Sequence, residues 1–289
     1  MDKICEQDVV NLFDQLVTEN VIVYGPHTKH QLTDEGYPIE IRICPALLTK
    51  PHQPGAANPN YNHTRRWGPG SDMFCPDERL ILCQLNHNAS HDLALNLFCV
   101  DRPQLLILTT DSYRRQHEPL DGADFAAVLE VLVKWTGWYV IFNCGEKGGC
   151  SRVHKHLQGL RGPPYAFKAL VDGAKGEGKG TVPFKYFLLR FVEGFAKVET
   201  SKMLSVYTAM LSQCREVLGL SEDEEICPHN VLLWDDCIVV VPRREGIWKG
   251  ASANTGGMLG SLWVPDQAEA DKWLELGCAN VLRELGVPS

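Results

Sequence analysis

Several features common in membrane, secreted and nucleic-acid-binding proteins are missing from this sequence. No stretch of about 18 apolar residues occurs, the minimum for a helix that crosses a bilayer. The N-terminal segment carries acidic residues within its apolar pattern, so neither a membrane span nor a secretion signal is expected. Lys and Arg number 28 against 36 Asp and Glu, a formal net charge of −8. Binding of duplex nucleic acid is therefore not expected, because it relies on many Lys and Arg contacts to phosphate.

The cysteines also lack the spacing of a zinc site. There are eleven of them, and no two are separated by two residues as in CxxC. An odd number of scattered cysteines is typical of free thiols in a reducing compartment. Cys144 and Cys150, followed by His154 and His156, come closest to a zinc site but lack a second short pair. We therefore expect a cytoplasmic protein, with the nucleus as a further compartment, and no metal site.

What remains is the composition of an ordinary globular enzyme or binding protein. Hydrophobic residues make up 44% of the 289 residues and charged residues 22%, enough to build a hydrophobic core. We find no internal repeat. We treat residues 1–289 as one domain, interrupted by a long loop over 49–77, rich in Pro and poor in apolar residues, and a flexible Gly/Lys loop over 172–181.

Hydrophobic periodicity predicts a mixed fold. Helical spacing occurs over residues 4–17, 121–136, about 200–218 and a single closing helix over 266–286. Strand patterns occur over 37–48, 93–100, 104–109, 138–143, 229–235 and 237–243. Strands separated by hairpin turns and by helices favour an α+β fold around an antiparallel sheet.

The sharpest local pattern is the segment 151–158, SRVHKHLQ, which follows a turn rich in glycine over 145–149. In an extended chain alternate side chains share a face, so we expect His154, His156 and Gln158 to line one surface. The glycines allow a tight turn whose N–H groups can face an anion. An imidazole beside a phosphate site can act as a nucleophile toward phosphorus. The pattern alone leaves two other interpretations open: a solvated surface strand, and metal binding by the two histidines.

Several motifs, in order along the chain, resemble those of a known family. The segment from Asn143-Cys-Gly to Ser151-Arg-Val-His-Lys-His-Leu-Gln resembles the signature of the fungal diadenosine tetraphosphate phosphorylases (ATP adenylyltransferases), a branch of the histidine-triad superfamily. Further matching segments are Cys44-Pro-Ala-Leu-Leu-Thr-Lys50-Pro, Phe74-Cys-Pro-Asp, Asn86-His-Asn, the run from Leu93 to Leu120, Pro183-Phe-Lys-Tyr, and Asn230-Val-Leu-Leu with the following Val-Val-Val-Pro-Arg243. The resemblance covers roughly residues 40–265 and implies a histidine-triad-like fold, an antiparallel β-sheet flanked by helices.

The resemblance also implies an activity and a site. Members cleave diadenosine tetraphosphate with phosphate to ADP and ATP through an adenylylated histidine, which maps onto His156. His154 would position it, and Gln158 would bind the transferred phosphoryl group. The residues implied to bind substrate are Lys50, Asn143, Gly148, Gly149, Ser151 and Arg152. No tightly bound cofactor is implied; Mg²⁺ would arrive with the polyphosphate, since the sequence shows no dedicated carboxylate cluster. The expected partners are the nucleotide and phosphate, and we expect a monomer.

Some residues depart from the family pattern or leave alternatives open. Cys144 and Cys150 replace small hydroxyl or glycine residues, and Arg152 stands where Gln is usual, which leaves the substrate open. A diverged enzyme for another reaction and a weakly catalytic dinucleotide sensor are therefore the alternatives. Arg243 is compatible with a phosphate contact or a surface salt bridge, and Trp135 is assigned with Trp138 to the core.

Overall fold

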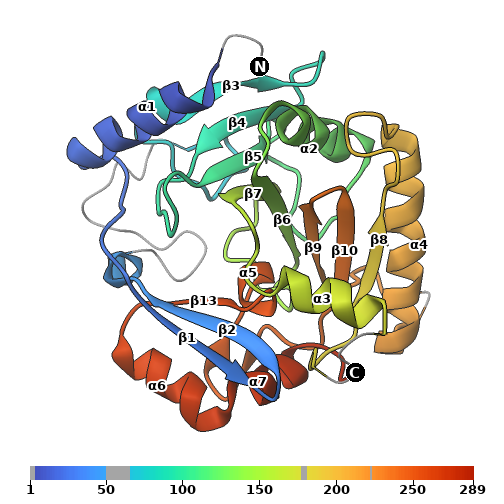
Figure 1. Cartoon of the computed structure of the whole chain (residues 1–289). Coiled ribbons are helices and arrows are strands. Elements are labelled where there is room, and N and C mark those ends of the chain that lie inside the picture. The colour runs from blue at the N-terminus through green and yellow to red at the C-terminus, as the bar shows by residue number, and fades with distance from the viewer. Residues whose placement is uncertain (1–3, 50–65, 177–180, 222) are drawn as a thin grey trace.

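An eight-stranded antiparallel sheet forms the centre of the computed structural model, which describes residues 4–49, 66–176, 181–221 and 223–289 (Figure 1). In spatial order its strands are β3 (Ile81–Leu85), β4 (His91–Leu95), β5 (Leu105–Thr109), β7 (His156–Arg161), β6 (Trp138–Cys144), β9 (His229–Trp234), β10 (Cys237–Pro242) and β8 (Phe187–Arg190). Every neighbouring pair is antiparallel. The predicted α+β fold around an antiparallel sheet flanked by helices is therefore confirmed.

Helices cover one face of this sheet, and a second core covers the other. α1 (Glu6–Thr18), α2 (Gly122–Lys134) and α4 (Thr200–Leu218) lie within two residues of their predicted bounds. Their buried side chains form one core with alternate strand residues, such as Val231 and Leu233 of β9. Leu232 between them packs into the second core. The period-two alternation of a strand thus divides the sheet residues between two apolar layers. Trp135 and Trp138 are buried in the first layer, as predicted.

The second core lies between the large sheet and a smaller, three-stranded one. β1 (Thr28–Asp34) pairs antiparallel with β2 (Tyr37–Ile43), and β13 (Ser261–Val264) runs parallel to β2 on its other side. This layer is completed by α3 (Phe167–Ala174), β11 (Ile247–Trp248), β12 (Ala251–Ser252), α5 (Thr255–Met258), α6 (Gln267–Leu276) and α7 (Cys278–Leu285). Figure 1 shows β1 and β2 beside the red C-terminal elements. Strands β1 and β2 and the C-terminal elements therefore build one layer together, although they lie far apart in the sequence.

The single closing helix predicted over 266–286 is wrong, because Gly277 divides it. Gly277 has φ 77°, a conformation that ends α6 and that a residue with a side chain rarely adopts. The backbone N–H of Ala279 at the start of α7 donates to Asp34 Oδ2 at 2.8 Å, so β1 caps the second helix. The break lets α6 pack against β2 and β13 of the small sheet while α7 packs against β11.

Two predicted boundaries also move. The strand predicted over 37–48 ends at Ile43, since Pro45 begins the 3₁₀ helix η1 (Pro45–Thr49) and proline has no N–H for a ladder. The loop predicted over 172–181 starts later, because α3 continues through Ala174; residues 177–180 lie outside the described residues. Of the long loop predicted over 49–77, residues 66–77 are described, and they precede η2 (Glu78–Leu80).

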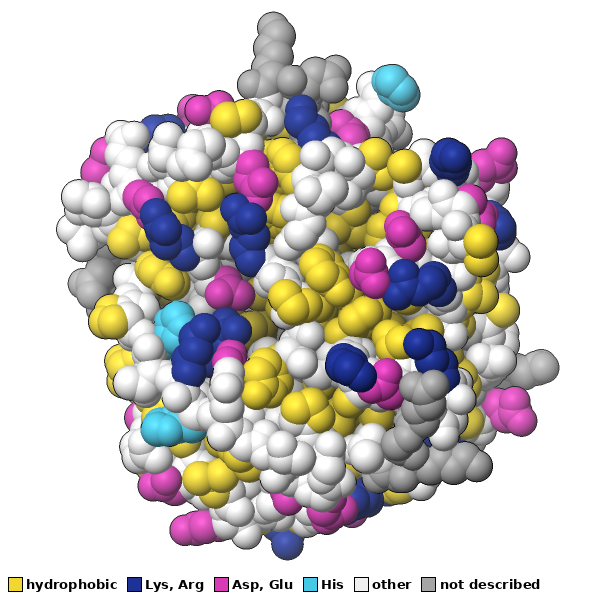
Figure 2. All heavy atoms as spheres, in the orientation of Figure 1, with side chains coloured by type: hydrophobic (Ala, Val, Ile, Leu, Met, Phe, Trp, Pro, Cys, Tyr) yellow, Lys and Arg dark blue, Asp and Glu magenta, His cyan; other side chains and the backbone are white. Residues whose placement is uncertain are grey.

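Charged side chains are mixed over the surface. Figure 2 shows basic and acidic side chains interspersed over one face, with hydrophobic side chains between them. Exposed pairs such as Arg79 with Glu19 and Arg190 with Asp235 join opposite charges. Within the described ranges, no helix combines the length and the apolar character that a membrane crossing requires.

Helix α2 starts at a capping box that offers a stability test. Asp121 accepts hydrogen bonds from the N–H groups of Ala123 and Asp124, and Asp124 accepts in return from the N–H of Asp121. Burial alone would raise the pKa of Asp121, but the backbone hydrogen bond from Asp124 and the side-chain bond from Arg114 outweigh it and lower the pKa to about 2. The carboxylate therefore stabilises the fold above the ordinary pKa of 3.8, and this contribution is lost as the pH falls through the folded value.

Replacing Asp121 with Ala is expected to cost about 1 kcal/mol of unfolding free energy near neutral pH, the usual value of an N-cap. Asp121→Asn keeps a capping oxygen but cannot ionise, so its deficit relative to wild type should shrink as the pH is lowered from about 4 toward 2. Urea unfolding of the three proteins across this range measures both effects. A deficit of Asp121→Asn that grows on acidification would contradict the assignment.

Candidate functional site

His156 begins β7, near the middle of the large sheet, and its backbone is clamped on both sides. Its N–H donates to Gln116 Oε1 at 2.8 Å, and Gln116 Nε2 donates to the carbonyls of His156 at 2.9 Å and Asn143 at 3.0 Å. Gln116 is buried and so ties the start of β7 to the end of β6. Gln116 was not predicted as a site residue, because it lies 40 positions from His156 in the chain.

The ring of His156 has a defined tautomer. Nδ1 lies 2.8 Å from the carbonyl oxygen of His154. A carbonyl can only accept, so Nδ1 carries the hydrogen, and in the neutral ring Nε2 carries the lone pair. The side chain is 6% exposed and lines two adjoining cavities. A buried, oriented imidazole with its lone pair at Nε2 is suited to nucleophilic attack.

His154 is placed differently from what the strand pattern predicted. Asp72 accepts the N–H groups of both Val153 and His154 at 3.1 Å, so these residues precede β7 rather than extend it. The His154 ring is fully buried, with Nδ1 2.8 Å from Ser71 Oγ and Nε2 2.9 Å from the Thr109 carbonyl. It lines neither cavity, so the expectation that three polar side chains share one surface is wrong for His154.

Burial also lowers the pKa of His154, which keeps its ring neutral near neutral pH. His154 contacts His156, the candidate nucleophile, through its backbone: the His154 carbonyl accepts a hydrogen bond from His156 Nδ1–H. The buried side chain in turn fixes that carbonyl, because both of its nitrogens are anchored.

The glycine turn before the motif is shaped by sterics. A Cβ on Gly148 would lie 2.4 Å from the Cys144 carbonyl oxygen, and one on Gly149, at φ 81°, would lie 2.5 Å from that of Ala253. The N–H groups of Gly148 and Gly149 donate within the turn, to the carbonyls of Gly145 and Glu146. The expectation that these two N–H groups face an anion is therefore wrong. Gly149 lines a cavity, whereas Gly148 lines neither of the two described below.

Asn143, at the end of β6, is held with its amide in one orientation. Its Oδ1 accepts from the backbone N–H of Thr255 at 2.8 Å, from Thr255 Oγ1 at 2.6 Å and from Asn230 Nδ2 at 3.2 Å. A backbone N–H identifies the acceptor as oxygen, so Nδ2 is the remaining donor. Among the described residues Nδ2 has no partner, and Asn143 lines a cavity. The sequence gives no local signal for Thr255, and Asn230 belongs to a matching motif for which no role was predicted.

Arg243 stabilises the positions of Asn230 and of the glycine turn through hydrogen bonds. It is fully buried and donates to Asn230 Oδ1 and to the carbonyls of Gly148, Glu245, Ala253 and Leu285. Both interpretations offered by the sequence, a phosphate contact and a surface salt bridge, are wrong for this residue. It binds backbone and amide oxygens behind the glycine turn.

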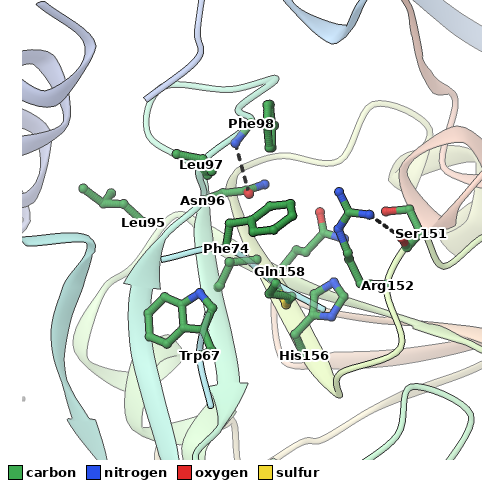
Figure 3. Close-up of a pocket in the computed structure, with 12 residues that line it drawn as sticks. Trp67, Phe74, Leu95, Asn96, Leu97, Phe98, Ser151, Arg152, His156 and Gln158 are labelled. Carbon is green, nitrogen blue, oxygen red and sulfur yellow. Dashed lines mark hydrogen bonds between the residues drawn. The ribbon is translucent and has the colours of Figure 1, made fainter. Parts of the chain in front are cut away.

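The two cavities meet at five residues, Asn96, Phe98, Ser151, His156 and Gln158. We call the first the aromatic cavity; it is further lined by Trp67, Met73, Phe74, Leu95, Leu97, Leu106 and Arg152. We call the second the polar cavity; it is further lined by Leu47, Val100, Gln104, Asn143, Gly149, Asn254 and Trp263. In Figure 3 Trp67 lies on the left and His156 on the right, with the ring of Phe74 between them.

This arrangement separates two kinds of recognition. Flat aromatic and aliphatic surfaces suit a planar heterocycle, which gains by stacking and by apolar burial. Amide and hydroxyl groups, such as those of Asn143 and Ser151, suit phosphate oxygens. His156 and Gln158, at the junction, can reach a phosphorus that links the two parts. Phe74 belongs to a motif that the sequence analysis quoted without a role, and Asn96 is the one polar residue in the run LALNLF.

The remaining predicted positions divide by location. Ser151 lines both cavities and Arg152 the aromatic one, whereas Lys50 lies outside the described residues. Of the departures from the family pattern, Arg152 lines the site. Cys144 is buried with its thiol donating to the His117 carbonyl, and burial raises the pKa of Cys150 to about 11. Neither cysteine lines the described cavities.

The described part of the chain contains no group of three His, Cys, Asp or Glu side chains that could hold a metal ion. Among its residues that line the two cavities, none is Asp or Glu. The site as described thus offers no carboxylate ligands for Mg²⁺.

Two family models match successive parts of the chain. The Ap4A phosphorylase N-terminal domain matches residues 24–167, and the ATP adenylyltransferase C-terminal domain matches residues 180–288. The large sheet takes strands from both parts, with β6 of the first beside β9 of the second.

Relatives in Saccharomyces cerevisiae match at the sequence level. Diadenosine 5',5'''-P1,P4-tetraphosphate phosphorylase 2 is 26% identical over 265 residues, which is 81% of this chain and 78% of that protein. Protein APA1 of the same yeast is 26% identical over 179 residues, 55% of this chain and 56% of that protein.

Solved structures share the fold. The crystal structure of yeast Ap4A phosphorylase Apa2 aligns with a TM-score of 0.77 at 22% identity, covering 98% of this chain and 97% of that one. Its complexes with AMP and with Ap4A each align with a TM-score of 0.76. This chain therefore belongs to the family of nucleotidyltransferases that comprises the ATP adenylyltransferases and diadenosine tetraphosphate phosphorylases.

Proposed function

We propose that this protein cleaves diadenosine tetraphosphate with phosphate to ADP and ATP, through an adenylyl group held on His156. The observation that carries the proposal is the lone pair of His156 Nε2, in a ring whose Nδ1–H is held by the His154 carbonyl, at the junction of the aromatic and polar cavities. The names of the yeast relatives support the same substrate: one is a diadenosine tetraphosphate phosphorylase, and Apa2 was crystallised with Ap4A and with AMP.

In the first step, His156 Nε2 attacks the phosphorus next to one adenosine. The N–P bond forms while the bond from that phosphorus to the bridging oxygen breaks, and ATP leaves. The ring gains positive charge as the bond forms, and the Nδ1–H bond to the His154 carbonyl disperses it. An adenine in the aromatic cavity would place its α-phosphorus near the nucleophile, and the outgoing polyphosphate would occupy the polar cavity.

In the second step, an oxygen of inorganic phosphate attacks the same phosphorus. The N–P bond breaks, ADP forms, and His156 returns to the neutral state with its lone pair restored. The sum of the two steps is Ap4A plus phosphate giving ADP plus ATP, with no net change in the enzyme. Each step exchanges one ligand on phosphorus, so one set of donors serves both.

The donors that stabilise the charge on the phosphoryl oxygens are assigned by position. Gln158 and Ser151 line both cavities beside His156, Asn143 presents Nδ2 to the polar cavity, and Arg152 lines the aromatic one. Preorganised donors of this kind are each worth about 10²- to 10³-fold in rate. Lys50, outside the described residues, is proposed as an added positive charge on the polyphosphate.

The remaining partners follow from the same site. Because the described lining lacks carboxylates, we propose that Mg²⁺ is brought by the polyphosphate and that no cofactor is tightly bound. A monomer is proposed because one chain supplies the nucleophile and both cavities. The cytoplasm, with the nucleus as alternative, is supported by eleven cysteines that form no disulfide, all within the described ranges.

Intact-mass analysis with a phosphate chase tests the proposal. Protein incubated with Ap4A in the absence of phosphate should gain the mass of one AMP and release ATP. Addition of ³²P-labelled phosphate should then remove the adduct and place the label in the β-position of ADP, leaving ATP unlabelled. A dinucleotide-binding sensor would bind Ap4A without forming products or adduct. A diverged enzyme would form the adduct but release it to an acceptor other than phosphate.

A further inference from the structure

Gln104 lies immediately before β5, is 2% exposed, and reaches the site from the neighbouring strand. We propose that Gln104 is a positioning residue: it holds the side-chain amide of Gln158 so that the NH₂ group, and not the oxygen, faces the reacting phosphoryl group. The inference rests on the proposed function, because it assigns a role within adenylyl transfer.

The direction of each hydrogen bond follows from one unambiguous donor. The backbone N–H of Val100 can only donate, and it lies 3.0 Å from Gln104 Oε1. The other end of the Gln104 amide is therefore the Nε2 donor, which lies 2.8 Å from Gln158 Oε1. Since Gln158 Oε1 is taken up as an acceptor, its Nε2 is the group left for the site. A backbone N–H at residue 100 thus sets the orientation of an amide at residue 158.

The position of Gln158 makes that orientation matter. It stands two residues after His156 on β7, so the two side chains emerge on one face of the strand, and both line the two cavities. Within residues 4–49, 66–176, 181–221 and 223–289, Gln104 is the hydrogen-bond partner of the Gln158 side chain, and its Nε2 has none. An anionic phosphoryl group is an acceptor, so it needs this Nε2 donor.

Without Gln104, the two orientations of the Gln158 amide would differ little in energy. Turning the amide by half a rotation would present Oε1 to the phosphoryl oxygens, where two acceptors repel each other. If the amide is held in this wrong orientation, the donor to the developing oxyanion is lost and the rate falls by about 10²- to 10³-fold; if both orientations are populated, the loss is only a few-fold. The contact is made where charge develops, so we expect the loss in the rate of adenylylation rather than in the binding of the nucleotide.

Gln104→Glu distinguishes a positioning role from a merely structural one, because only a positioning role makes the rate depend on the protonation state of the introduced carboxyl group. As a carboxylate, Glu at this position can only accept, so it would take the N–H of Val100 and draw the Gln158 Nε2 toward itself, turning Oε1 to the substrate. As a carboxylic acid, it can accept from Val100 and donate its O–H to Gln158 Oε1, which restores the wild-type direction. Burial raises the pKa of a carboxyl group, so the protonated form is accessible at moderately acidic pH.

The measurement is the single-turnover rate of adduct formation on His156, together with the Kd for Ap4A, as functions of pH. For Gln104→Glu we expect about a 100-fold lower rate at saturating Ap4A and high pH, recovering toward wild type as the pH falls. Saturation is needed because a carboxylate that lines the polar cavity also weakens the binding of the polyphosphate. Gln104→Met, which can neither donate nor ionise, leaves the Gln158 amide free to take either orientation and should lose only a few-fold in rate, without dependence on pH. Gln213→Glu, an exposed position on α4, is the matched control and should follow the wild-type profile.

A second set of variants tests whether Gln104 affects the rate through Gln158. In a Gln158→Met background, Gln104→Glu should cause little further loss and no acid recovery, because the group through which it acts is gone. Wild-type rates in Gln104→Glu at every pH, or an equal, pH-independent loss in both Gln104 variants, would overturn the inference. If wild type itself forms no adduct, the proposed function fails instead. Thermal unfolding of each variant separates loss of rate from loss of fold.

Discussion

Replacing His156 with Asn is expected to lower the rate of Ap4A cleavage by about 10⁴-fold while leaving the fold and the binding of nucleotide in place. The Asn side chain can still donate a hydrogen bond to the His154 carbonyl, which His156 Nδ1 contacts at 2.8 Å. It therefore keeps the structural contact and removes only the lone pair of Nε2. Loss of a nucleophile commonly costs four to six orders of magnitude, roughly, because the remaining donors still bind the transition state.

Three measurements check this result: steady-state turnover, adduct formation by intact mass, and nucleotide affinity by calorimetry. Loss of turnover and of the adduct with affinity retained would place the covalent step at His156. His30→Asn, at an exposed position on β1, is the matched control and should leave all three unchanged. An adduct that still forms in the His156 variant would show that another group carries the adenylyl transfer.

The parts of the molecule that could be predicted from the sequence are those set by neighbouring residues. Helix α2 was predictable because Asp121 and the apolar spacing after it are local signals, and the capping box is present. His156 and Gln158 were predictable as a pair because a strand places alternate residues on one face. The position of Gly277 was also a local signal that the closing segment forms two helices, because α6 ends at this glycine, whose φ is positive.

The residues that were missed act across long distances in the chain. Gln116 bridges β6 and β7 through hydrogen bonds 27 and 40 positions away. His154 was assigned to the strand face because its spacing fits, but Asp72, 81 and 82 positions away, takes the N–H groups that a strand would use. Trp67 and Phe98 line one cavity with Leu106 of β5 and Gln158 of β7, and these two strands meet only in the folded sheet. Periodicity carries no information on such pairings.

Arg243→Met is expected to lower the free energy of unfolding by about 3–5 kcal/mol, the largest stability effect that we expect of a single substitution here. The guanidinium is fully buried and donates to one amide oxygen and four backbone carbonyls, including those of Gly148 and Ala253. Methionine fills a similar volume but leaves these acceptors buried without a donor, and each such acceptor costs about 1–3 kcal/mol. Some of this cost is relieved by relaxation and by the loss of a buried charge.

Urea unfolding at neutral pH measures the loss, and Arg244→Met is the matched control. Arg244 is the next residue and is exposed, so its substitution should change the free energy by no more than about 0.5 kcal/mol. A loss in Arg243→Met no greater than that of the control would contradict the assignment. Because Asn230 holds both Arg243 and Asn143, the folded fraction of Arg243→Met should also bind phosphate groups less tightly in the polar cavity. The stability of the glycine turn and the recognition of the polyphosphate would then both depend on the buried guanidinium of Arg243.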